Sequence, residues 1–273
     1  MRLIASNYTK VNEQLGLSFS GNYHHNDGFF TNLHTHKKAD KLDNGAGRIG
    51  LTWKPAAHWT TRFITSYEYS NQGGYPYGLY NADKGTTEAV NYNNEGLYRR
   101  NLLTSGINIR YNGPHISFNS QTSYQYIQDK MGIDQDFSPR NIFYGQNKIR
   151  QHMYCQEFTV KSVNKSRYHW ITGAFVFRQT INRKVDLSRF TDTTRHLTNS
   201  GIPTQGIAFY HQSTLDLLQG LSCSVGLRYD YEHARCDFSK VQQPLNGNGE
   251  TKSLEQFNRS LHFGQFTPRF SMQ

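Results

Sequence analysis

The sequence predicts an all-β fold, an antiparallel up-and-down transmembrane β-barrel, from two features. Long stretches alternate between apolar and polar residues, and the connections between them are short and long in turn. The short, polar turns are Lys54–His58, Asn112–His115, Val163–Arg167 and Asp216–Gly220. The long, polar connections are His24–Asn44, Asn71–Tyr98, Gln128–Lys148, Gln179–Thr204 and Ala234–His262. Long loops at one end of a meander and tight turns at the other are typical of outer-membrane barrels.

The segment Leu221–Glu232 shows the alternation most clearly, and Trp59–Ser70 and Ile116–Tyr126 repeat it. Because successive side chains of a strand point to opposite faces, each segment has one apolar and one polar face. This pattern predicts about ten strands of a larger barrel. They span residues 10–23, 45–54, 59–70, 99–112, 115–127, 149–162, 168–178, 205–215, 221–233 and 263–271. The chain has no linker-like segment, so residues 1–273 are predicted to form one barrel domain.

Three observations favour a membrane barrel over a soluble sheet protein. The predicted strands are longer than the roughly five or six residues usual in soluble proteins. Only 36% of the residues are hydrophobic, which is little for a large soluble core, whereas 14% are aromatic. Aromatic residues also gather at two levels of the apolar faces, as two lipid headgroup interfaces would select. At the loop end these are Tyr23, Tyr67, Tyr69, Tyr124, Tyr126, Tyr229 and Tyr231; at the turn end they are Trp53, Trp59 and Tyr111.

Several short motifs resemble barrel strands of the TonB-dependent outer-membrane receptors. Gln156-Glu157-Phe158 followed by Trp170–Phe175 is similar to a pair of mid-barrel strands, and Gly226–Glu232 and Thr267–Ser271 are similar to two later strands. The resemblance implies the outer membrane of a Gram-negative bacterium and energy-driven import of a scarce ligand, such as a ferric siderophore or haem. It implies three partners: outer-membrane lipid with lipopolysaccharide, a small-molecule ligand such as an iron complex, and the TonB complex.

The resemblance implies a barrel of about 22 strands and a TonB complex that acts through an N-terminal plug domain, which residues 1–273 are not expected to include. The chain is therefore expected to be a mid-barrel fragment of such a receptor.

Candidate ligand-binding residues lie in the second long loop and on the polar faces of the strands. Tyr75, Tyr77 and Tyr80 alternate with turn formers, and their rings could stack on a catecholate, porphyrin or sugar. Arg62, Arg110 and Arg228 fall on polar faces and could attract an anionic ligand. The structural alternative is that these arginines pair with carboxylates such as Glu68 or Asp230 and brace the barrel wall.

Histidines gather around the first long loop: His24, His25, His34 and His36. Neutral imidazoles bind zinc, copper, nickel or haem iron, so these four are candidate metal ligands, although their spacing matches no defined ligand framework. Loops also tolerate histidine without any such role. The sequence contains no motif that indicates a resident cofactor or a catalytic site.

The net charge of +10 does not indicate nucleic-acid binding, because the basic residues form no recognisable nucleic-acid module. Two other functions remain open beside the receptor. A passive diffusion porin would share the loop pattern, and a surface β-rich adhesin or carbohydrate-binding protein would share the strand content.

Overall fold

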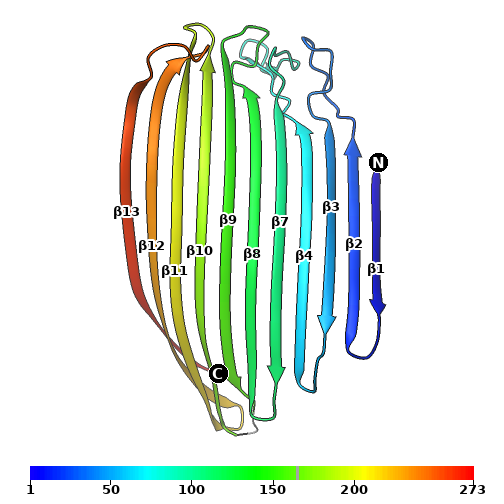
Figure 1. Ribbon diagram of the computed structural model, residues 1–273, viewed down its shortest axis with the longest axis vertical. Helices are drawn as coiled ribbons and strands as arrows, with labels where there is room; N and C mark the ends of the chain where they lie inside the picture. Colours follow the sequence, from blue (N-terminus) through cyan, green and yellow to red (C-terminus); the bar gives the residue numbers. More distant parts are fainter. Residues whose placement is uncertain (164–165) are drawn as a thin grey trace.

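The protein is one antiparallel sheet of eleven long strands with a small hairpin beside it. The computed structural model describes residues 1–163 and 166–273. Each long strand pairs with the next one along the chain, so the sheet is a simple meander (Figure 1). In sheet order the strands are β1 (Arg2–Lys10), β2 (Leu15–Asn26), β3 (Leu42–Trp53), β4 (Trp59–Gly73), β7 (Leu97–Asn112), β8 (Ile116–Asp134), β9 (Phe143–Ser162), β10 (Tyr168–Arg189), β11 (Thr194–Leu218), β12 (Leu221–Pro244) and β13 (Lys252–Met272). The hairpin consists of β5 (Tyr80–Asn81) and β6 (Thr86–Thr87).

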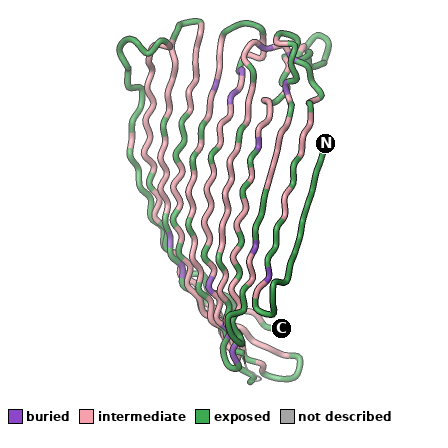
Figure 2. The backbone as a smooth tube through the Cα atoms, turned by 45° about the vertical axis from the view of Figure 1, so that its right-hand side comes forward, coloured by how far each residue is buried: buried purple, intermediate pink, exposed green. Residues whose placement is uncertain are grey.

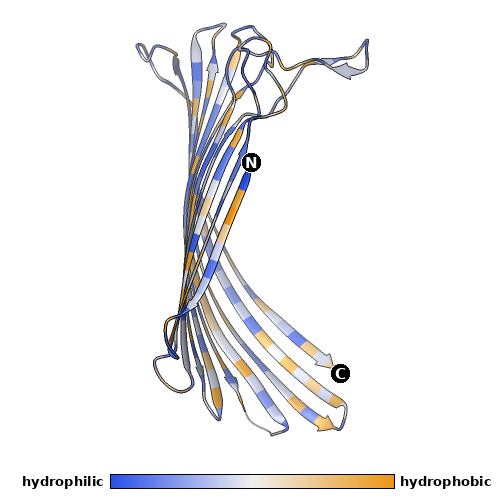
Figure 3. Ribbon diagram, turned by 90° about the vertical axis from the view of Figure 1, so that its right-hand side faces the viewer, coloured by the Kyte–Doolittle hydropathy of each residue, from blue (hydrophilic) through white to orange (hydrophobic). Residues whose placement is uncertain are grey.

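The sheet is open, with β1 and β13 at its two edges. Every residue of β1 is exposed, and almost every residue of β13 is exposed as well. The edges curve toward the same side, so the sheet has a concave and a convex face (Figure 3). No helix among the described residues is long and apolar enough to span a membrane.

The two faces differ in exposure and in chemistry. In β11, Gly206 and Ala208 are buried, whereas the alternate residues Ile207 and Phe209 are exposed. The face with Gly206 and Ala208 is the concave face, where neighbouring side chains crowd together. The exposed convex face carries most of the large apolar side chains, and Figure 2 shows how exposed and half-buried positions alternate along the strands. This is the apolar-outside, polar-inside pattern predicted for a membrane barrel.

The first predicted strand, 10–23, is wrong in its boundaries, because the chain turns back within it. β1 ends at Lys10, and β2 begins at Leu15. The amide nitrogens of Gln14 and Leu15 both donate to the side-chain oxygen of Asn12, which forms a tight polar turn. The sheet therefore has one strand more than the predicted ten.

Three of the predicted long loops are largely strand. The segments 128–148, 179–204 and 234–262 continue the ladder to connections at 135–142, 190–193 and 245–251. Gln179, for example, pairs with Thr204 in the register of β10 and β11. Polar residues predominate in these extensions, and apolar side chains such as Ile181, Val185 and Leu187 lie on the concave face, opposite to the apolar face of the predicted strands. The apolar-outside pattern therefore does not extend into them, although the backbone still satisfies its hydrogen bonds by pairing. As a consequence, Tyr229 and Tyr231 lie in the middle of β12 and not at its end.

Successive connections alternate between two ends of the sheet as predicted, and the longest, 27–41 and 74–96, lie at the loop end (Figure 1). The alternation of long and short is wrong for the connection at 190–193, which is as short as the turns at the other end. Turns at 54–58, 113–115 and 219–220 lie at one end, and Trp59 packs against Tyr111 there with ring centroids 5.0 Å apart. The predicted turn Asp216–Gly220 is shorter, because β11 continues to Leu218. Part of the predicted turn Val163–Arg167, residues 164–165, lies outside the described residues.

Candidate ligand-binding site

Two long connections, 27–41 and 74–96, pack into one body at the loop end of β2–β9. Asn32 is only 1% exposed, and its side-chain amide donates to the backbone oxygen of Tyr92 at 2.8 Å. The amide of Leu33 donates to the backbone oxygen of Val90 at 2.9 Å. Ala39 joins Val90 and Tyr92 in a small apolar core. The buried side chain of Asn32 thus holds the second loop through its NH2 group, while its Oδ1 accepts from the backbone amide of His34 in its own loop.

The third connection, 135–142, joins this body through Asp134. The Asp134 carboxylate is 2% exposed and accepts hydrogen bonds from the backbone amides of Asn94 and Phe137, at 3.1 and 3.0 Å. The carboxylate lies near the ring of Tyr92, whose pKa is raised by burial and, to a lesser extent, by the charge of Asp134. A backbone contact between Asn93 and Ser138 closes the same interface. These three connections are called the loop body below.

Aromatic rings cluster on the exposed side of the loop body. The centroids of Tyr75 and Tyr77 are 5.6 Å apart, and Tyr77 lies 5.0 Å from Phe137 of the third connection. Tyr75 is 58% exposed, so its ring is available to a ligand. Tyr80 lies apart from this cluster, in β5 of the projecting hairpin. Sequence reasoning missed Phe137, because only the fold brings the third connection beside the second.

The four histidines do not form one group. His24 and His25 are consecutive residues of β2, so their side chains point to opposite faces, while His34 and His36 lie in the first loop. His25 contacts Asp43 at 2.8 Å and Asp27 at 2.9 Å. Within the described part of the chain, no three His, Cys, Asp or Glu side chains form a cluster that could hold a metal. A metal role for these histidines stays a prediction.

The three predicted arginines all lie on the concave face. Arg110 and Arg228 belong to one register row that crosses the sheet through Thr159, Gly173 and Tyr210. Arg62 lies on the adjacent row, which passes through Asn108, Gln121, Glu157 and Asp230. Their alignment follows from the strand register, because directly opposite residues of paired strands share a face.

Arg228 differs from the other two arginines because it is paired. Its Nη2 lies 2.7 Å from the Asp230 carboxylate, and its guanidinium lies 5.9 Å from the centre of the Tyr210 ring. The Tyr210 hydroxyl donates to Glu157 at 3.1 Å and lies 2.9 Å from the Thr159 hydroxyl. This network braces the wall, as the structural alternative expected.

Arg62 and Arg110 have no ion-pair partner among the described residues. Arg110 lines a polar depression of about 570 Å³ on the concave face. Lys161 and Glu157 also line it, and Asn108 donates to Asn119 at 2.8 Å along its floor. A guanidinium only donates hydrogen bonds, and Arg110 is exposed with no carboxylate paired to it among the described residues, so its donors are available to an anionic or carbonyl-rich ligand.

Comparison with solved structures finds outer-membrane receptors of the same fold, although no protein-family model matches the sequence. The ferric yersiniabactin uptake receptor FyuA from Yersinia pestis is 14% identical with a TM-score of 0.73 over 98% of this chain. The siderophore receptor PiuA from Acinetobacter baumannii is 10% identical, with a TM-score of 0.70 over 99%. The ferric-catecholate import receptor Fiu from E. coli K12 is 9% identical, with a TM-score of 0.70 over 98%.

This chain covers 42% of FyuA, 44% of PiuA and 49% of Fiu, so it spans less than half the length of each. At these identities the likeness is one of fold, in which eleven consecutive antiparallel strands follow a receptor barrel wall. The chain has the fold of the barrel wall of TonB-dependent outer-membrane siderophore receptors.

Proposed function

We propose that residues 1–273 are a partial barrel domain of an outer-membrane receptor that imports a scarce small molecule, such as a ferric siderophore or haem. The loop body carries this proposal. It lies at one end of the sheet and bears the exposed rings of Tyr75 and Tyr77, while the concave face bears the unpaired cations Arg62 and Arg110. Rings above a cationic lumen suit a ligand that is aromatic or anionic.

The proposed activity is binding and transport, with no chemical step. In this proposal the convex face contacts outer-membrane lipid and lipopolysaccharide, and the concave face lines the lumen. The free edges of β1 and β13 pair with further strands, because unpaired backbone groups are costly in lipid. A plug domain and the TonB complex supply the energy for import.

Uptake of iron by cells that produce the full-length receptor tests this proposal. Radiolabelled iron is supplied as catecholate, hydroxamate, citrate or haem complexes, with and without a functional TonB complex. We expect saturable uptake of one complex that is lost when TonB is removed, because the plug must be displaced by an external force.

Two outcomes of that assay would contradict the proposal in different ways. Uptake that is not saturable and continues without TonB would indicate a porin. Surface binding of a glycan without any iron uptake would indicate an adhesin. A receptor variant with an altered TonB-contacting segment is the matched control, because its barrel and loops are unchanged.

A further inference from the structure

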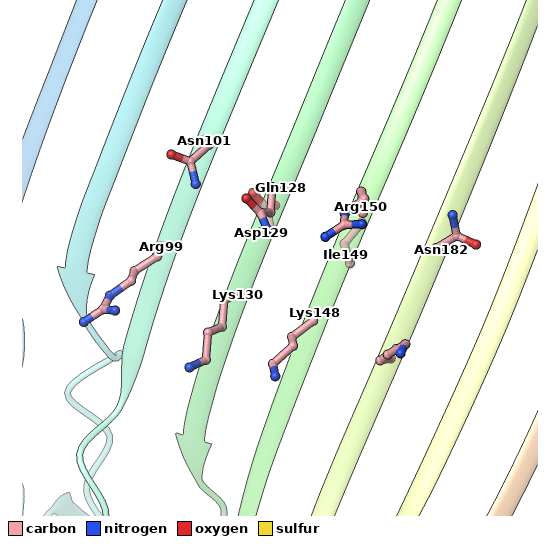
Figure 4. Close-up of a pocket in the computed structure, with 10 residues that line it drawn as sticks. Arg99, Asn101, Gln128, Asp129, Lys130, Lys148, Ile149, Arg150 and Asn182 are labelled. Atoms are coloured by element: carbon pink, nitrogen blue, oxygen red, sulfur yellow. The ribbon is translucent and has the colours of Figure 1, made fainter.

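Four cations lie side by side across the convex face near the loop end. Arg99 of β7 pairs in register with Lys130 of β8, Lys130 pairs with Lys148 of β9, and Lys148 pairs with Lys184 of β10. Arg150 lies on the adjacent row of the same face. Figure 4 labels Arg99, Lys130, Lys148 and Arg150 along neighbouring strands, and together with Lys184 they line a pocket of about 670 Å³. These five residues are called the basic row.

The register of the strands fixes the face on which the basic row lies. Asn71 of β4 pairs with Arg99, and two residues earlier Tyr69 points to the same, convex face. Arg99, Lys148, Arg150 and Lys184 are all exposed, and Lys130 is partly exposed. Arg183, next to Lys184 in β10, points to the concave face instead. The basic row therefore does not belong to the lumen.

The basic row has no neutralising partner of its own among the described residues. Within residues 1–163 and 166–273, none of its five members is in an ion pair, and their one side-chain hydrogen bond is from Arg99 to Asn71 at 3.1 Å. Of the nearby carboxylates, Asp129 points to the other face and holds Arg100 at 2.7 Å, and Asp186 lies 3.7 Å from Arg195. Like charges directly opposite one another in a sheet are destabilising. A multivalent anion over the row would remove this repulsion.

The height of the basic row matches a lipid headgroup. Tyr126 and His152 have ring centroids 4.9 Å apart, and Tyr124 and Tyr154 have centroids 4.7 Å apart, on the convex face of β8 and β9. Lys130 comes after Tyr126 on the same face of β8, about 13 Å farther along the strand. For a strand tilted by roughly 40°, this distance is about 10 Å along the membrane normal. The backbone of Lys130 thus lies slightly above a headgroup layer that is roughly 5 to 8 Å deep, and its long side chain can extend back into that layer. Going toward the loops, the face thus changes from apolar to aromatic to cationic.

We propose that the basic row binds the phosphate groups of a phosphorylated glycolipid of the lipid A type, with Arg99, Lys130, Lys148, Arg150 and Lys184 as its ligands. The proposal rests on the membrane placement given above and assigns that placement a specific lipid site. Arginine and lysine suit phosphate oxygens, and several cations on adjacent strands suit a headgroup with more than one phosphate. The acyl chains would lie on the apolar part of the convex face below.

Binding of fluorescent diphosphoryl lipid A to the detergent-solubilised full-length receptor tests this site. The triple variant Lys130→Gln, Lys148→Gln, Lys184→Gln is expected to bind about a hundredfold more weakly, since each cation near an anionic lipid contributes roughly fivefold. The matched control is Arg48→Gln, Arg183→Gln, Lys240→Gln, which removes the same charge from the concave face. It should bind lipid A as the unmodified receptor does.

The competing results are distinct. Equal lipid A binding by both triple variants, with both inserted in the membrane, would overturn the lipid site and leave the barrel placement intact. Competition by millimolar inorganic phosphate, with no preference for lipid A, would identify a simple anion site and overturn the glycolipid assignment. Recovery of the receptor outside the membrane fraction would overturn the lipid site together with the membrane placement.

Discussion

Replacing Gly173 with valine should lower the free energy of unfolding of the receptor by about 3 kcal/mol. A Cβ atom at Gly173 would lie 2.3 Å from the Tyr210 ring and 2.7 Å from the backbone oxygen of Phe158. Tyr210 lies across the glycine and would have to move. Its contacts with Thr159 and Glu157 would then be lost, in addition to the steric cost.

The comparison variant is Gly47→Val. A Cβ atom at Gly47 would have no atom within 4 Å, so its substitution should change stability by less than about 0.5 kcal/mol. Urea unfolding of the full-length receptor in detergent, followed by tryptophan fluorescence, measures both variants. Equal stability of the two would show that Tyr210 does not cover Gly173.

Removing the rings of Tyr75 and Tyr77 together should weaken ligand binding about thirtyfold, which is the effect of losing roughly 2 kcal/mol at a binding hot spot. The two rings and Phe137 form the exposed aromatic cluster of the loop body. The double variant Tyr75→Ala, Tyr77→Ala removes this surface but keeps the buried contacts of Asn32 and Asp134, so the loops should stay folded. Deleting the segment around these two tyrosines would be less informative, because a deletion that reaches Gly73 would also remove the end of strand β4.

Binding is measured with the ferric complex that the uptake assay selects. Tyr168→Ala is the matched control, because Tyr168 is also an exposed tyrosine but lies at the turn end of β10. Unchanged affinity of the double variant would mean that the ligand is recognised elsewhere in the receptor. A loss shared by Tyr168→Ala would indicate a general effect on the barrel.

The sequence was sufficient for the parts of the fold in which one face is apolar. In Leu221–Glu232 the contrast between faces predicted both the strand and the orientation of Arg228. It failed where the convex face is polar, as in Gln179–Arg189, because the apolar residues Ile181, Val185 and Leu187 lie on the concave face there while backbone pairing continues. The early turn near Asn12 was missed for a related reason, since a single polar residue can reverse a chain that otherwise alternates.

The sequence could indicate which residue types form the candidate site, but not which residues lie beside one another in the fold. Tyr75 and Tyr77 could be chosen because they alternate with turn formers, whereas four strands, β5 to β8, separate Phe137 from them along the chain. The pairing of Arg228 with Asp230 was open in the sequence, because residues two apart on one strand share a face but need not touch. The basic row needed the strand register, since its members are dispersed between Arg99 and Lys184.

The membrane placement is tested most directly by measuring which face of the sheet contacts lipid. Nitroxide labels are placed one at a time at Phe209 and Val225 on the convex face, and at Asn119 and Gln212 on the concave face, in membrane-embedded receptor whose three cysteines are replaced by serine. We predict that molecular oxygen accelerates the spin relaxation of the two convex labels. A water-soluble nickel complex should accelerate the relaxation of the two concave labels only. Nickel access to all four positions alike would contradict a barrel wall with its apolar face in lipid.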